Sequence, residues 1–157
     1  MNRLRLSQDE YNTVWGRFEF RFNFRPDYYE TTKPAILETP GSVVYSIAEP
    51  FEDNLIDPLS QTFIDAYAQI IPKGHWLYWL DWQHDCYKLD LHNPDNTSPH
   101  LDIFPDGDYF ITLNETMSLG TFGHPWQESI CVFGAELVKR IDADPPKCFS
   151  HVIRRNP

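Results

Sequence analysis

The sequence has few cysteines and no long apolar segment, and each absence excludes a class of protein. Its 157 residues contain three cysteines, an odd number without the spacing of a disulfide framework, so structural disulfides are not expected. No window approaches the roughly 18 to 20 apolar residues of a membrane span. The first residues contain no apolar core of a signal peptide. We therefore expect a soluble, cytoplasmic protein.

The sequence also lacks the short motifs that mark common catalytic sites. It has no glycine-rich phosphate loop, no Gly-x-Ser-x-Gly, no His-Glu-x-x-His and no Cys-x-x-Cys, and we expect no cofactor. Its 13 lysines and arginines do not cluster, and 23 acidic residues give a net charge of −10. This charge disfavours nucleic acid and anionic membranes as direct partners and suits a basic protein partner.

Hydrophobic periodicity predicts helices and strands along the whole chain. Ser7 and Glu10 form a capping-box pattern before a helix over residues 8–22, although alternating phenylalanines in the same stretch also fit a strand. Asp57 and Pro58 suit the N-cap and first position of a second helix, which Pro72 closes. Strands are predicted over residues 42–47, 75–82, 86–91, 109–113 and 117–122.

The stretch from residue 120 to residue 141 is predicted to be a tight turn followed by a core helix. Two glycines permit the turn, and Pro125 suits the first helical position. The apolar residues that follow recur at helical spacing: Trp126, Ile130, Phe133, Leu137 and Ile141.

The order of these elements predicts an α+β fold. Several consecutive strands joined by short turns form a mainly antiparallel sheet, and about three helices pack on it. No repeat, low-complexity tract or long linker divides the chain, so residues 1–157 are expected to form a single domain.

Three ordered motifs carry a resemblance to a known family. They are Leu80-Asp81-Trp82-Gln83-His84-x-Cys86-Tyr87, Pro105-Asp106-Gly107-Asp108-Tyr109, and Gly120-x-Phe122-Gly123-His124-Pro125-Trp126 with Ile130-Cys131-Val132-Phe133-Gly134. Together they resemble a family of small bacterial proteins catalogued as a domain of unknown function. The resemblance implies a compact, soluble bacterial domain, and it supplies no activity, cofactor or catalytic residue.

Two histidines stand out as candidates for chemistry. His84, His124 and Asp81 could lie together at the opening of one pocket. In that arrangement they suit acid–base catalysis at neutral pH or, with Cys86 as a further ligand, metal binding. No recognised metal-ligand spacing accompanies them. The structural alternatives are a strand-end histidine bound to a neighbouring carboxylate for His84, and a turn histidine that hydrogen-bonds its own backbone for His124.

Two functions are compatible with these features. The first is a protein-binding module rather than an enzyme, namely a bacterial immunity protein that holds a basic toxin through an acidic face. The residues expected on that face are Asp85, Asp90, Asp95, Asp102, Asp106 and Asp108. The second is a small-ligand binder or metal-dependent enzyme that uses a pocket of His84, His124 and Asp81.

Overall fold

The computed structural model describes residues 2–26, 34–47, 52–93 and 101–157. The elements within these residues are, in chain order, β1 (Asn2–Arg5), α1 (Gln8–Phe22), β2 (Val43–Ser46), the short 3-10 helix η1 (Asp53–Leu55), α2 (Ile56–Ile70), β3 (Leu77–Asp81), β4 (Tyr87–Asp90), β5 (Phe110–Asn114), β6 (Gly120–His124), β7 (Ser129–Phe133), α3 (Ala135–Ala143) and β8 (His151–Arg155). Among the residues described, none of the helices could serve as a membrane span.

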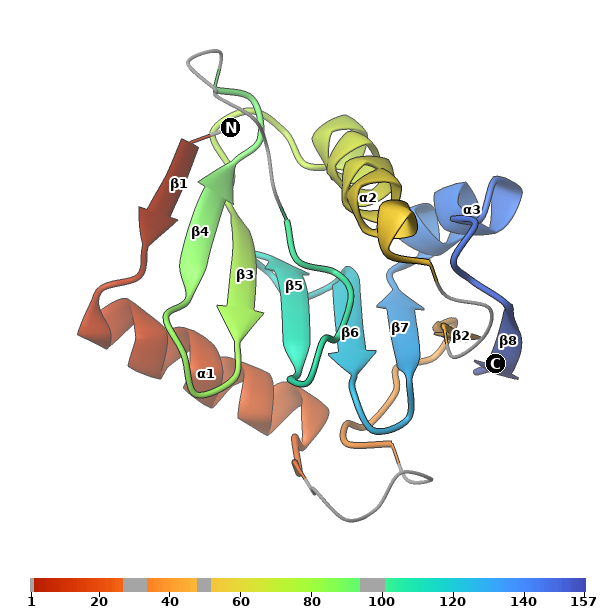
Figure 1. Cartoon of the computed structure of the whole chain (residues 1–157). Helices are drawn as coiled ribbons and strands as arrows, with labels where there is room; N and C mark the ends of the chain where they lie inside the picture. The colour runs from red at the N-terminus through yellow and green to blue at the C-terminus, as the bar shows by residue number, and fades with distance from the viewer. Residues whose placement is uncertain (1, 27–33, 48–51, 94–100) are drawn as a thin grey trace.

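All eight described strands form one sheet in the order β1-β4-β3-β5-β6-β7-β2-β8. Every neighbouring pair is antiparallel. Helix α1 packs on one face of this sheet, and α2 and α3 pack on the other (Figure 1). The predicted α+β fold, with a mainly antiparallel sheet and about three helices, is confirmed, and the helices cover both faces.

Alternate side chains of strands β2, β3 and β7 enter two separate apolar cores. On β3, Leu77 and Trp79 belong to the core beneath α2 and α3, whereas Leu80 belongs to the core beneath α1. Helix α1 contributes Trp15 and Phe18, whose rings pack edge to face at 5.8 Å. Because the strand alternation matches the pleat of the sheet, both faces of β3 are buried, as its apolar sequence predicts.

A buried polar contact joins α2 to the centre of the sheet. The hydroxyl of Tyr67 lies 2.5 Å from Thr112 Oγ1, which lies 2.5 Å from Thr121 Oγ1. These hydroxyls satisfy one another where no water reaches. The adjacent Gly120 permits the close approach of the strands, because a Cβ atom there would lie 1.9 Å from the carbonyl oxygen of Thr112.

The first predicted helix is confirmed, together with its cap. Ser7 Oγ accepts a hydrogen bond from the Glu10 N–H, and a carboxylate oxygen of Glu10 accepts one from the Ser7 N–H. Lys88 on β4 lies 2.5 Å from the same carboxylate. The hydrogen bonds from Lys88 and Ser7 lower the pKa of Glu10 to about 2. The capping box therefore fixes the start of α1 and also ties it to the sheet.

The prediction of one helix from Pro125 to Ile141 is wrong in its first half. Residues Ser129–Phe133 form β7, and only Ala135–Ala143 are helical. Ile130 lies in the core beneath α2 and α3, whereas Phe133 lies in the core beneath α1, so the stretch has the alternation of a strand. Gly134, with a φ of 92°, then turns the chain from the strand into α3.

Three further differences are one helix boundary and two strands that the sequence did not predict. Helix α2 has its N-cap at Leu55, so Asp57 is already helical and is not the cap that the sequence predicts. Strands β1 and β8 were not expected from the sequence. They are short and lie at the two edges of the sheet, where β1 pairs with β4 and β8 pairs with β2.

Candidate functional site

The turn between β3 and β4 brings a histidine onto two carboxylates. Asp81 ends β3, and His84 Nδ1 lies 3.0 Å from its Oδ1. Asp108, on the segment before β5, places its Oδ2 3.1 Å from the same nitrogen. Gln83, with a φ of 65°, allows the chain to reverse there. The histidine is therefore a strand-end residue bound to neighbouring carboxylates.

The pKa values of this cluster are shifted by these contacts. The hydrogen bond that His84 donates to the carboxylate of Asp81, together with the negative charge of that carboxylate, raises the pKa of His84, because both stabilise the imidazolium. Burial raises the pKa of Asp81 even though His84 acts in the opposite direction, and Asp108 adds repulsion. Asp81 is thus a carboxylate whose charge its surroundings do not fully compensate.

The same cluster forms one wall of an open groove of about 560 Å³ on the sheet face that carries α2 and α3. We call it the acidic groove, and its lining residues are Arg3, Trp79, Asp81, Gln83, His84, Asp85, Tyr87 and Asp102. They come from β1, β3, β4, the β3–β4 turn and the segment before β5.

The aspartates predicted to form one acidic face are divided by the structure. Asp85 and Asp102 line the acidic groove. Asp108 does not line it directly but pairs with His84, which does. Asp106 is exposed in the neighbouring turn, beside Gly107. Asp90 lies at the opposite end of β4, where its carboxylate accepts from the His92 N–H. Asp95 lies outside the described residues.

His124 is not part of the cluster formed by Asp81, His84 and Asp108. It is only 2% exposed at the end of β6, and its Nδ1 accepts the Gln127 N–H at 3.1 Å. Its ring packs on Tyr109 at 5.2 Å. His124 is therefore a buried turn histidine that binds its own backbone, the structural alternative considered above.

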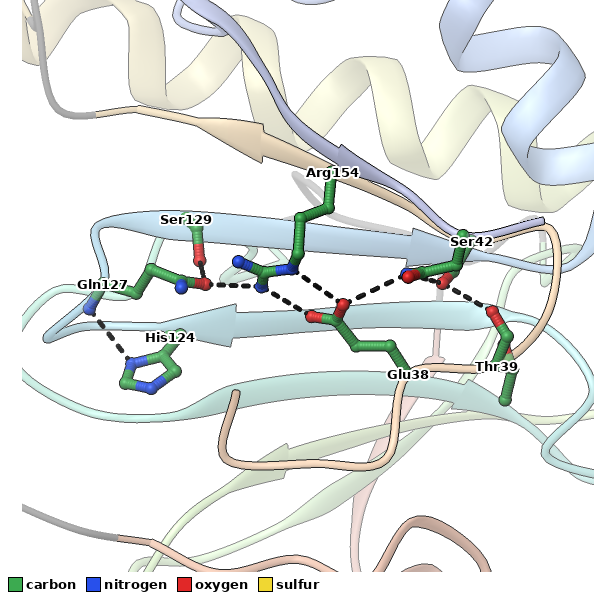
Figure 2. Close-up of polar contacts among 8 residues, drawn as sticks. Glu38, Thr39, Ser42, His124, Gln127, Ser129 and Arg154 are labelled. Carbon is green, nitrogen blue, oxygen red and sulfur yellow. Dashed lines mark hydrogen bonds and ion pairs between the residues drawn. The ribbon is translucent and has the colours of Figure 1, made fainter. Parts of the chain in front are cut away.

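A second polar network, which no sequence pattern signals, centres on the largely buried carboxylate of Glu38 (Figure 2). Arg154 on β8 donates to it twice, from Nε at 2.9 Å and from Nη2 at 2.7 Å. Asn156 donates to the same carboxylate at 3.0 Å. Arg154 also donates to the side chain of Gln127, which accepts from Ser129 as well. This network joins the segment before β2, the β6–β7 turn and β8.

Comparison with known proteins identifies the family of this chain. A family model described as a protein of unknown function (DUF2716) matches residues 5–138. The chain belongs to the DUF2716 family. The uncharacterized protein YxiI of Bacillus subtilis (strain 168) is similar to it, with 27% identity over 158 residues that cover 95% of this chain and 98% of YxiI. No solved structure matches.

The DUF2716 match includes most of the acidic groove but ends before part of the buried network. Residues from Trp79 to Asp102 lie inside it, whereas Arg3 precedes its first matched residue. Glu38 lies inside it, and its partner Arg154 lies beyond its end. Membership of the DUF2716 family therefore confirms the resemblance seen in the sequence, and it brings no activity with it.

The three cysteines of this DUF2716 protein are buried thiols that form no disulfide. Burial raises the pKa of Cys131 to about 12 and that of Cys148 to about 11. It also raises the pKa of Cys86, whose Sγ lies 3.5 Å from the carbonyl oxygens of Asp81 and His84. Since the thiolate is the reactive form and the usual metal ligand, these cysteines are suited to packing.

Proposed function

We propose that this chain is a protein-binding module, a cytosolic bacterial immunity protein that neutralises a basic toxin by holding it at the acidic groove. The observation that supports this is the convergence of four carboxylates, Asp81, Asp85, Asp102 and Asp108, around one open groove. The net charge of −10 extends the same negative field beyond the groove. Such a field attracts a basic protein from a distance and orients it before contact.

The surrounding chemistry favours binding over covalent catalysis. The cysteines carry raised pKa values, and His124 is enclosed and already accepts from the Gln127 backbone. His84 is exposed, but its nearest described partners are the carboxylates of Asp81 and Asp108, not a hydroxyl or thiol that it could activate as a nucleophile.

Capture of a native partner tests this proposal. The chain is immobilised and incubated with the product of the neighbouring gene, and binding is measured at increasing salt concentration. We expect capture that weakens as salt rises, because the attraction between exposed charges is screened. The double variant Asp85→Asn, Asp102→Asn should lose binding several-fold or more.

The matched control neutralises the same number of charges on helix α1. Asp9 and Glu19 are exposed there, and α1 packs on the opposite face of the sheet. The variant Asp9→Asn, Glu19→Gln should retain the affinity of the unmodified chain. Absence of a retained partner, or equal losses in the two double variants, would contradict the proposal.

A second candidate function is metal binding by the Asp81, His84 and Asp108 cluster. One ligand atom of each residue lies within 4.8 Å of the others, which is compatible with a shared cation. This cluster differs from the predicted pocket of His84, His124 and Asp81, because it contains Asp108 and not His124. Elemental analysis and zinc titration by calorimetry test it: stoichiometric binding that is lost in His84→Ala would favour a metal-dependent function.

A further inference from the structure

The floor of the acidic groove is an aromatic pair that already contacts a guanidinium group. Trp79 and Tyr87 lie opposite each other on the antiparallel strands β3 and β4, with ring centroids 5.3 Å apart. The guanidinium carbon of Arg3, on the edge strand β1, lies 4.8 Å from the centroid of Tyr87 and 5.6 Å from that of Trp79. These distances are within the range of cation–π attraction.

Resting on the proposed function, we propose that the acidic groove binds an arginine side chain of the protein partner, which displaces Arg3 from the rings of Trp79 and Tyr87. Arg3 then acts as an internal competitor that occupies the site in the unbound protein. Its side chain can move aside because Arg3 is exposed on a strand at the edge of the sheet.

The charges around the rings suit a guanidinium group. Asp81 and Asp102 line the groove beside the aromatic pair, and the side chain of Asp81 is 26% exposed. Asp85 pairs with Arg5 at 2.7 Å, but both side chains are more than half exposed. Exposed ion pairs contribute little to stability, so an incoming cation can exchange with them.

Arginine fits this arrangement better than lysine. Its planar guanidinium can stack on a ring while its edge donates two parallel hydrogen bonds to a carboxylate. The ammonium of lysine is a compact, strongly hydrated charge that lacks this planar geometry. Discrimination between the two side chains therefore separates a specific site from general attraction to negative charge.

Trp79 also provides a local reporter of this site. The residue is 6% exposed, and its indole Nε1 has no hydrogen-bond partner among the described residues. The rest of the indole ring lies beside Tyr87 and the guanidinium of Arg3.

Nuclear magnetic resonance tests the proposal directly. The probe is N-acetyl-arginine N-methylamide, with the lysine analogue as comparison, and the readout is the indole N–H signal of Trp79, assigned from a Trp79→Phe variant. We expect the arginine probe to shift this signal in a saturable way and to bind more tightly than the lysine analogue. Arg3→Gln should bind the arginine probe about 2- to 5-fold more tightly, because it removes the competitor.

The control for Arg3→Gln is Arg25→Gln, which makes the same charge change at an exposed position after the end of α1. It should leave the affinity for the probe unchanged. Tyr87→Leu should weaken binding about 2- to 5-fold through loss of the ring. If Tyr87→Leu is poorly folded, Asp102→Asn takes its place, and its binding should also be weaker.

Each outcome supports or overturns the inference. Equal binding by the unmodified chain, Arg3→Gln and Arg25→Gln, equal affinity for the two probes, or an unmoved Trp79 signal would overturn it. Failure of the arginine probe while a toxin is still captured overturns this inference and leaves the proposed function standing. Specific arginine binding without any captured toxin supports the groove as an arginine site and overturns the immunity role.

Discussion

Replacement of Glu38 by glutamine offers the sharpest test of what holds the edge of the sheet in place. The Glu38 side chain is only 9% exposed, and its carboxylate accepts hydrogen bonds from Arg154 and Asn156. Glutamine has the same shape, but it removes the negative charge and turns an N–H₂ group toward donors. Arg154 is then left without its counter-ion next to the apolar core.

The expected loss can be derived from burial. Breaking a fully buried pair by removing one partner costs about 3 to 5 kcal/mol. The Arg154 side chain is 28% exposed, so water compensates part of its charge. We therefore expect Glu38→Gln to lower the free energy of unfolding by about 2 to 3 kcal/mol. For a chain of this length, that loss lowers Tm by about 4 to 12 °C.

Urea denaturation followed by circular dichroism measures this loss, and a double-mutant cycle isolates the pair. The cycle compares Glu38→Gln, Arg154→Gln and the double variant, and we expect a coupling energy of at least about 1 kcal/mol. The exposed Glu19→Gln is the control and should change stability by less than about 0.5 kcal/mol. If Glu38→Gln resembles this control, or the two single changes are additive, the network does not stabilise the fold as argued.

Four further predictions address other parts of the molecule. Ser7→Ala should lower the free energy of unfolding in urea by about 1 kcal/mol, and Ser7→Asp should restore most of it, because aspartate also caps helices. Gly16→Ala should raise the free energy of unfolding by up to about 1 kcal/mol, since a helical Cβ there meets nothing within 4 Å. Gly120→Ala should instead lower Tm sharply, because its Cβ would lie 1.9 Å from the backbone oxygen of Thr112. The pKa of His84 is raised, so proton NMR should place its midpoint above the ordinary value of about 6.5, and Asp81→Asn should lower it. Because the folded-state pKa is the higher one, the contribution of His84 to stability is present at low pH and is lost as pH rises through that midpoint.

Local patterns were sufficient where the residues that decide an element lie close together in the chain. The capping box of Ser7 and Glu10 predicted the start of α1 correctly, since both partners lie within one turn. The apolar run that became β3 was also predicted, because both of its faces are buried. In these cases the local signal and the tertiary environment favour the same conformation.

Local patterns failed where two periods fit the same residues. Ile130 and Phe133 lie on the apolar stripe of a helix, but as strand residues they enter the opposite cores of the sheet. Pairing of β7 with both β6 and β2 decides between these periods, and those partners are distant in the sequence. The edge strands β1 and β8 were not predicted either. Most of their residues are exposed, so their sequences lack the alternation of apolar and polar residues that marks a half-buried strand.

The candidate site was partly predictable from the sequence. The nearness of His84 to Asp81 follows from the short turn between β3 and β4. Asp85 and Asp102 were both among the aspartates expected on an acidic face, and both line the groove. That Asp102 lies beside Trp79 depends on how the segment before β5 returns over the sheet, which no local pattern encodes. The contact of Arg3 with the rings of Trp79 and Tyr87 likewise depends on the pairing of β1 with β4 at the edge of the sheet.

These long-range contacts also explain why the groove contains a cation in an acidic protein. Asp81 at the end of β3 and Asp102 in the segment before β5 line the groove together with Trp79 and Tyr87, and β1 brings the guanidinium of Arg3 over the two rings. The internal cation offsets repulsion between the carboxylates and covers aromatic surface that would otherwise face water. A partner that supplies its own arginine restores both effects, and it also gains the contacts made by the rest of its surface. The exchange therefore costs little at the groove itself, and the affinity gained is set by how well the partner fits around it.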